Sequence, residues 1–188
     1  MSIKIVALVG SLRKGSLNRA LLREAIAAAP AGVEVELLEI SEIPFYNGDL
    51  QDQGFPESVS RLGDALRQAD GVLLVSPEYN YSISGVMKNA IDWMSRVPNQ
   101  PFAGKPVALM GASMGALGTA RAQYHLRQVL VCLDAHVMNK PEIMVGSAHT
   151  KFDEQGKLTD QTTRDHMAKA MVAFQAYVAR FGAAVVKA

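Results

Sequence analysis

Short apolar runs recur along the chain, separated by polar and glycine-rich turns. Ile3 to Val9 (IKIVALV) is nearly continuous and rich in β-branched residues, which is typical of a strand buried on both faces of a parallel sheet. Val33 to Ile40 begins with apolar and polar residues in alternation, as expected of a strand nearer the sheet edge. Three further strands are predicted at Gly71 to Ser76, at Pro106 to Gly111 and within Val137 to Val145, where Pro141 is expected to interrupt or shorten the strand.

Segments in which apolar residues follow helical spacing come after these strands. Thr159 or Asp160 is expected to cap the last helix, whose apolar face continues to about Phe181, with Gly182 as its stop. The segment before that helix, Ser147 to Lys157, is polar and is predicted to be a surface loop. The other helices are predicted at Asn18 to Ala29, Pro56 to Ala69, Val86 to Arg96 and Thr119 to Leu133.

Strands that alternate with helices predict a three-layer α/β domain built on a doubly wound sheet. Right-handed crossovers then bring the loops after the first, third and fourth strands to one edge of the sheet. In doubly wound sheets, ligands bind at that edge, at the switch between the first and third strands. We therefore expect the functional site in these three loops.

Composition indicates an ordinary globular protein. The 188 residues are 49% hydrophobic and 20% charged, and we expect residues 1–188 to form a single domain. A net charge of +1 argues against nucleic-acid and membrane partners. Cys132 is the only cysteine, so no intrachain disulfide exists, and its apolar helical surroundings predict a small core residue. With no signal peptide expected before Ile3 and no run of membrane-spanning length, we expect a cytoplasmic protein.

The loop after the first strand, Gly10 to Asn18, has the composition of a phosphate site. Backbone N–H groups and the positive end of a helix meet there, and Ser11, Ser16, Asn18 and Arg13 add side-chain donors and a positive charge. It lacks both the lysine that follows the second glycine of a nucleoside triphosphate loop and the GxGxxG dinucleotide pattern. The alternative is a plain turn in which Ser16 or Asn18 caps the helix, but a terminal monophosphate accounts for all these donors.

The loop after the third strand, Ser76 to Gly85, is dense in Tyr, Asn and Ser. Such a loop offers flat apolar faces beside hydrogen-bonding edges, which suits a planar heteroaromatic ring. The alternative is that Tyr79 or Tyr81 covers the core while Glu78 and Asn80 satisfy backbone groups. In the helix that follows, Trp93 lies beside an apolar stripe, and either core packing or a subunit interface explains it.

Small residues dominate the loop after the fourth strand, Gly111 to Gly118. Glycines let backbone N–H groups approach a ligand closely, so this loop is expected to form the third wall of the same site. The alternative is a mobile surface loop. No metal site is expected, because the four histidines show no metal-binding spacing.

Several segments resemble the NAD(P)H-dependent FMN reductase family, specifically its chromate- and quinone-reducing branch. They are GSLRKGSLN (residues 10–18), SPEYNYSISGVMKNAIDWMSR (76–96), GKPVALMGASMG (104–115), RAQYHLRQVL (121–130) and MNKPE (138–142). The resemblance implies a flavodoxin-like fold with five parallel strands in the order 2-1-3-4-5. It also implies FMN as the bound cofactor and a homodimer or homotetramer. Three residues on matching segments either contribute to this assembly or are ordinary surface residues: Arg121, Tyr124 and Glu142.

Position by position, the resemblance implies the residues that hold FMN. The phosphate would be bound by Ser11, Arg13, Ser16, Leu17 and Asn18. Pro77, Glu78, Tyr79 and Asn80 would line the isoalloxazine ring and ribityl chain, with Ser113 nearby. Met114 departs from family members that carry a double glycine here, so the contacts at the flavin edge are expected to differ.

No side chain of the chain accepts a hydride by itself, and no dithiol pair is present. The redox chemistry therefore requires a cofactor, and no catalytic side chain is assigned. The expected reaction transfers electrons from NADH or NADPH through FMN to a small-molecule acceptor, such as a quinone, chromate, an azo compound or free flavin. One alternative is a flavodoxin-type carrier between proteins, although a net charge of +1 argues against the acidic docking face of such carriers. Another is a regulatory module that binds a nucleotide monophosphate.

Overall fold

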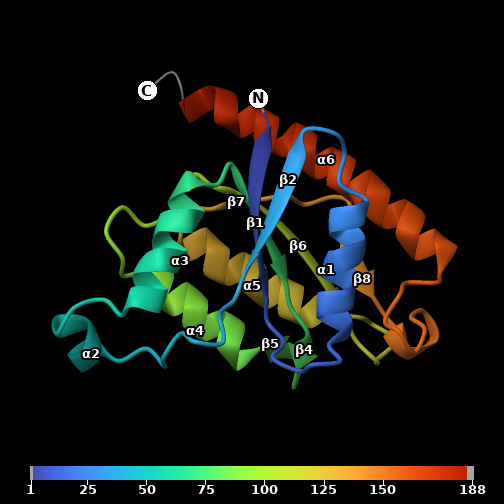
Figure 1. Ribbon diagram of the computed structural model, residues 1–188, viewed down its shortest axis with the longest axis horizontal. Coiled ribbons are helices and arrows are strands. Elements are labelled where there is room, and N and C mark those ends of the chain that lie inside the picture. The colour runs from blue at the N-terminus through green and yellow to red at the C-terminus, as the bar shows by residue number, and fades with distance from the viewer. Residues whose placement is uncertain (1, 186–188) are drawn as a thin grey trace.

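A parallel β-sheet forms the centre of the protein. The computed structural model describes residues 2–185, and Figure 1 shows the sheet between two layers of helices. The strands run in the order β2-β1-β3-β6-β7, with β8 also paired to β6, and all these pairings are parallel. This arrangement confirms the predicted fold and the order 2-1-3-4-5. The strands are β1 (Ile3–Val9), β2 (Val33–Leu38), β3 (Gly71–Val75), β6 (Pro106–Ala112), β7 (His136–Val137) and β8 (Ile143–Val145).

The fifth strand is divided into two pieces, as predicted from Pro141. Val107 pairs with Val137 in β7, and Met110 pairs with Ile143 in β8. Proline has no backbone N–H to give to the sheet. The pairing with β6 therefore stops before residue 141 and resumes at Ile143.

Most helices lie within a few residues of their predicted bounds. Asp160 caps the last one, since its Oδ1 accepts a hydrogen bond of 2.8 Å from the Thr163 N–H. The expected stop at Gly182 was wrong, because the helix continues to Val185; a glycine inside a helix costs only about 1 kcal/mol. The short helix α2 was not predicted. The helices are α1 (Leu17–Ala27), α2 (Gly48–Asp52), α3 (Glu57–Gln68), α4 (Gly85–Met94), α5 (Ala120–Cys132) and α6 (Gln161–Val185).

Two hydrophobic clusters fill the two faces of the sheet. Alternate residues of β1 serve both: Ile5 lies in the cluster under α1 and α6, and Val6 in the cluster under α3, α4 and α5. Burial on both faces is the reason that this strand is apolar throughout. Trp93 belongs to the second cluster, is fully buried, and donates from Nε1 to the Pro44 carbonyl at 2.8 Å. Core packing therefore explains Trp93, and the interface alternative was wrong.

Two local expectations need correction. Cys132 is exposed rather than buried, because the buried stripe of α5 runs through Leu126 and Leu130 and leaves residue 132 on the outer side. The segment Ser147 to Lys157 is not wholly a surface loop, since Ala148 and Phe152 are buried in the core. Among the described residues, no helix has the length and apolar character needed to cross a membrane.

Candidate functional site

The three expected loops meet at the carboxyl ends of β1, β3 and β6. They enclose a cavity of about 260 Å³, and nine of the ten predicted site residues line it. Asn80 is the exception: it lines an adjoining hollow of about 470 Å³, to which Glu78 and Ser113 also belong. The residues of the first cavity are Ser11, Arg13, Ser16, Leu17, Asn18, Pro77, Glu78, Tyr79 and Ser113, with Ala112 and Met114.

The loop after β1 presents a run of free backbone donors. The Gly10 N–H is bonded to the Val75 carbonyl at 2.9 Å, whereas no N–H from Ser11 to Asn18 donates to another described residue. The last of these groups belong to the first turn of α1, where the helix dipole is positive. Such an arrangement is a ready-made anion site.

Two side chains in this loop already have structural roles. Ser16 caps α1, because its Oγ accepts a hydrogen bond of 3.2 Å from the Arg19 N–H. The Asn18 amide is buried and bonded to the backbone of Ala112 in β6. The capping alternative therefore holds for Ser16, and the Asn18 side chain uses its oxygen and one of its two amide N–H groups to hold Ala112. The backbone N–H of Asn18 remains available to a ligand.

Glu78 joins the second loop to α5. Its side chain is 8% exposed, and its Oε2 accepts hydrogen bonds from the backbone N–H groups of Arg121 at 3.0 Å and Ala122 at 3.2 Å. Its Oε1 accepts from Arg121 Nη1 at 3.1 Å. A carboxylate in this position caps the helix and compensates its dipole. The expectation that Glu78 satisfies backbone groups is confirmed, although Glu78 also lines the cavity.

A tight hairpin, which the sequence did not predict, presents the aromatic residues of this loop. Its strands are β4 (Glu78–Tyr79) and β5 (Ser82–Ile83), and the turn residues Asn80 and Tyr81 have φ angles of 49° and 68°. Two successive left-handed residues define the mirror-image turn that suits a two-residue hairpin. Tyr81 is an unusual residue for it, and the Arg121 guanidinium lies 3.8 Å from the centre of its ring. Tyr79 and Tyr81 are exposed, so they do not cover the core.

The loop after β6 is held in place by the segment after β8. Ser113 exchanges backbone hydrogen bonds with Val145 and Ala148, and the Gly115 carbonyl accepts from the Ser147 N–H at 3.0 Å. Gly118 has a φ of +62°, and a Cβ there would come within 2.7 Å of Met144. The N–H groups of Ser113 and Gly115 are occupied, whereas those of Met114 and Ala116 have no partner among the described residues. These hydrogen bonds fix the conformation of the loop, so they favour a defined wall of the site over the alternative of a mobile surface loop.

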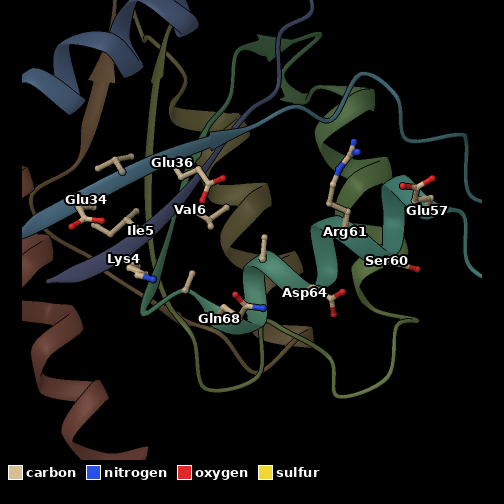
Figure 2. A pocket seen from close by; sticks show the side chains of 13 residues that line it. Lys4, Ile5, Val6, Glu34, Glu36, Glu57, Ser60, Arg61, Asp64 and Gln68 are labelled. Atoms are coloured by element: carbon tan, nitrogen blue, oxygen red, sulfur yellow. The ribbon is translucent and has the colours of Figure 1, made fainter. Parts of the chain in front are cut away.

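A larger hollow, of about 830 Å³, lies elsewhere, between β2 and α3. Figure 2 shows Glu34 and Glu36 on the strand and Arg61 and Asp64 on the helix. None of the predicted site residues lines it, and it flanks the first halves of β1 and β2 rather than the carboxyl edge of the sheet. Within residues 2–185, no cluster of His, Cys, Asp and Glu suits a metal ion.

Comparison with known proteins decides the family. A family model described as NADPH-dependent FMN reductase matches residues 3–150. The chain belongs to this family. It is 54% identical over 178 residues to an NAD(P)H-dependent FMN reductase of Pseudomonas aeruginosa, covering 95% of this chain and 96% of that one. It is 52% identical over 181 residues to a quinone reductase of Escherichia coli K12, with 95% and 96% of the two chains covered.

Solved structures agree with this membership. The flavoenzyme FerB of Paracoccus denitrificans, an NAD(P)H:(acceptor) oxidoreductase, superposes with a TM-score of 0.87 at 37% identity, over 95% of this chain and 98% of FerB. The family, the flavodoxin-like fold and the class of oxidoreductase that the resemblance implied are thereby confirmed. FMN and a nicotinamide nucleotide are the two cofactors of this family.

Proposed function

We propose that the chain, acting as a single FMN-binding domain over residues 1–188, holds FMN at the carboxyl ends of β1, β3 and β6 and reduces quinones with electrons from NADH or NADPH. One observation carries the proposal. Five residues of the loop with free N–H groups line the same cavity as the hairpin after β3: Ser11, Arg13, Ser16, Leu17 and Asn18. An anion site and an aromatic wall in one cavity match a molecule with a phosphate at one end and a flat ring at the other.

The phosphate would lie against the loop after β1. The backbone N–H groups of Leu17 and Asn18 in the first turn of α1 would donate to it, together with the Ser11 and Ser16 hydroxyls. Arg13 forms no ion pair within the described part of the chain, so its charge is available to balance a dianion.

The ring would lie between the loops after β3 and β6. Pro77, Tyr79 and Asn80 would line it on one side and Ser113 on the other, while Glu78 holds the hairpin against α5. Bound FMN supplies the redox chemistry that no side chain provides. The free N–H groups of Met114 and Ala116 would stabilise negative charge that develops at the edge of the ring.

Quinones are the acceptors that the relatives favour: the Escherichia coli relative is a quinone reductase, and potato has an NAD(P)H:quinone oxidoreductase 46% identical to this chain. Chromate, azo compounds and free flavin are further candidates for the same open cavity. An electron carrier is disfavoured, because a net charge of +1 gives no acidic docking face.

We also propose a homodimer or homotetramer in the cytoplasm. Met114 is 60% exposed and Leu117 58%, and both border the site, while Phe45, which is 84% exposed, lines a neighbouring hollow that shares Arg13 and Tyr79 with the site. Apolar side chains gathered at one edge of a protein commonly mark a subunit contact. Light scattering of the purified protein gives the oligomeric state, and cell fractionation gives the compartment.

The experiment that tests the function begins with the purified protein. Bound pigment is extracted and identified, the apoprotein is titrated with FMN and with FAD, and the oxidation of NADH and NADPH is followed with and without 1,4-benzoquinone. We expect FMN to bind with a stoichiometry of one and a quinone-dependent oxidation of the donor. An apoprotein that binds neither flavin contradicts the proposal, and a flavoprotein without turnover supports the carrier instead.

A further inference from the structure

β2 forms one edge of the sheet and leaves backbone groups free there. Among the described strands it pairs with β1 alone, so its outer edge has no partner strand. The Ile3 N–H donates to the Gly32 carbonyl at 2.7 Å, and in a parallel pair alternate residues turn both backbone groups to the same neighbour. The backbone of Glu34 therefore faces β1, whereas Val35 and Leu37 turn their N–H groups and carbonyls outward.

The two faces of β2 differ in chemistry. Val33, Val35 and Leu37 are half-buried and pack against the hydrophobic cluster under α1 and α6. Glu34 and Glu36 are exposed and line the hollow of about 830 Å³ between β2 and α3 (Figure 2), which we call the β2–α3 hollow. A strand added at the outer edge would place alternate side chains on these two faces. The edge therefore fits a segment in which charged residues alternate with small or apolar ones.

The β2–α3 hollow has an excess of negative charge, although the whole chain carries a net charge of +1. Four carboxylates line it against two cations, Lys4 and Arg61. Arg61 is already paired with Glu42 at 3.1 Å, whereas the two glutamates of β2 form no ion pair within residues 2–185. The side chains that would complement this hollow are thus positively charged.

A second copy of the chain does not suit this edge. Pairing β2 with the β2 of another molecule would bring the carboxylates of both strands together, and like charges opposite each other are destabilising. Charged residues on an edge strand protect it from such self-pairing. A basic segment has the opposite effect, because its cations would lie across from Glu34 and Glu36.

We propose that the outer edge of β2 binds an extended basic segment of a partner protein, which adds a strand to the sheet. Val35 and Leu37 would exchange backbone hydrogen bonds with it, as when extended peptides join a sheet edge in other proteins. Its Lys or Arg side chains would lie over the β2–α3 hollow. The six residues of β2 give a pairing length of about 20 Å. None of the residues that line this hollow lines the flavin cavity, so the two sites are separate.

The test uses the peptide KTKVKT, with a neutral fluorophore at its amino end and an amide at its carboxyl end. The receptor is the FMN-saturated protein, and fluorescence anisotropy measures the affinity. We expect saturable binding at about 50 mM salt and weaker binding at about 500 mM, because salt screens exposed charges. The acidic peptide ETEVET has the same pattern with the opposite charge and should not bind. A protein that does not bind KTKVKT, or that binds both peptides equally, overturns the proposal.

Methylated peptides test the backbone pairing. In an extended strand the N–H groups of alternate residues point to opposite edges, so one set would face β2 and the other would face solvent. One probe is methylated on its lysine amides, and a second on the amides between them. One of the two should lose about tenfold or more in affinity, and the other should bind like the parent peptide. Equal affinities for the two would show that charge alone holds the peptide, which also overturns the proposal.

Variants of the protein test the two features of β2. Glu36→Lys reverses one charge beside the hollow and should weaken binding of KTKVKT about fivefold. Val35→Pro removes an outward N–H, a change that edge strands tolerate, and should also weaken binding about fivefold. Thermal unfolding verifies that this variant folds. The matched control is Glu154→Lys, because Glu154 is exposed in the loop before α6 and the same change there should leave the affinity unaltered.

Equal affinities for Glu36→Lys and Glu154→Lys would contradict the role of the β2 carboxylates. Light scattering of Glu36→Lys completes the test, since a changed oligomeric state would assign the edge to a second copy of the chain instead of a basic partner. Neither FMN nor a quinone takes part in this binding. A protein that binds no flavin would therefore contradict the proposed function, while the peptide titration would still decide the role of β2.

Discussion

The side-chain amide of Asn18 is bonded to both backbone polar groups of Ala112: Nδ2 donates to the Ala112 carbonyl at 3.0 Å, and Oδ1 accepts from its N–H at 2.9 Å. The two residues are 94 positions apart, and both hydrogen bonds are buried. They connect the start of α1 to the end of β6. The first and third loops of the site are thus held at a set distance from each other.

Asn18→Ala should therefore lower the free energy of unfolding by about 2 to 4 kcal/mol, because it leaves a buried N–H and a buried carbonyl without partners. It should also weaken FMN binding, since the two loops lose their connection. Chemical denaturation and a flavin titration measure the two effects. Asn47→Ala is the control: Asn47 makes one exposed hydrogen bond at the start of α2, and its loss should cost about 1 kcal/mol. Equal losses for the two variants would refute the role given to Asn18.

Ser16→Asp separates the capping role of this residue from its role in the site. Aspartate caps a helix as well as serine does, so the stability of the apoprotein should change by less than about 0.5 kcal/mol. Its carboxylate would face the FMN phosphate, and flavin occupancy after purification should fall close to zero. Ser16→Thr keeps the hydroxyl and serves as the control. If Ser16→Asp retains full flavin occupancy, the phosphate does not lie at this loop.

Glu78 holds the hairpin against α5, so the removal of its carboxylate should destabilise both elements. Glu78→Ala leaves the N–H groups of Arg121 and Ala122 without acceptors, and we expect a loss of about 1 to 3 kcal/mol in unfolding free energy. Glu78→Gln keeps an oxygen acceptor and should lose about half as much. Denaturant unfolding of both variants provides the comparison. A smaller loss in Glu78→Ala than in Glu78→Gln would contradict the capping role.

The ion pair between Arg19 and Glu39 predicts a pH dependence. The hydrogen bond from Arg19 holds the pKa of Glu39 below its ordinary value, against a smaller opposing effect of burial. A carboxyl group with a lowered pKa in the folded state stabilises the protein above its unfolded-state pKa of about 4.3. That contribution disappears as the pH falls through the folded-state pKa.

Glu39→Gln should thus be less stable than the parent at neutral pH by under about 1 kcal/mol, since the pair is partly exposed. The difference should shrink as the pH falls below the unfolded-state pKa of about 4.3 and vanish below the lowered folded-state pKa. Unfolding experiments across this pH range measure it. Glu36→Gln is the control, because Glu36 on β2 forms no ion pair within the described residues. A Glu39→Gln effect that is independent of pH would show that the ion pair does not act through this carboxylate.

Local patterns in the sequence determined the strands, the helices and the place of the site. Apolar runs such as Ile3 to Val9 predict buried strands because burial on both faces of a sheet demands them at every position. The right-handedness of the crossovers is a general property of parallel sheets, so it places the three loops at one edge without any knowledge of long-range contacts. The order of the strands came from the resemblance to the family.

The tertiary structure alone decided what the polar side chains do. It joined Asn18 to Ala112 and Glu78 to the start of α5, and it turned Cys132 outward and left the Ser84 hydroxyl without a partner. Apolar burial repeats with the period of a helix or strand and is readable from neighbouring residues. A hydrogen bond depends on two groups coming within about 3 Å of each other, and when those groups are distant in the chain, only the packing of whole elements brings them together.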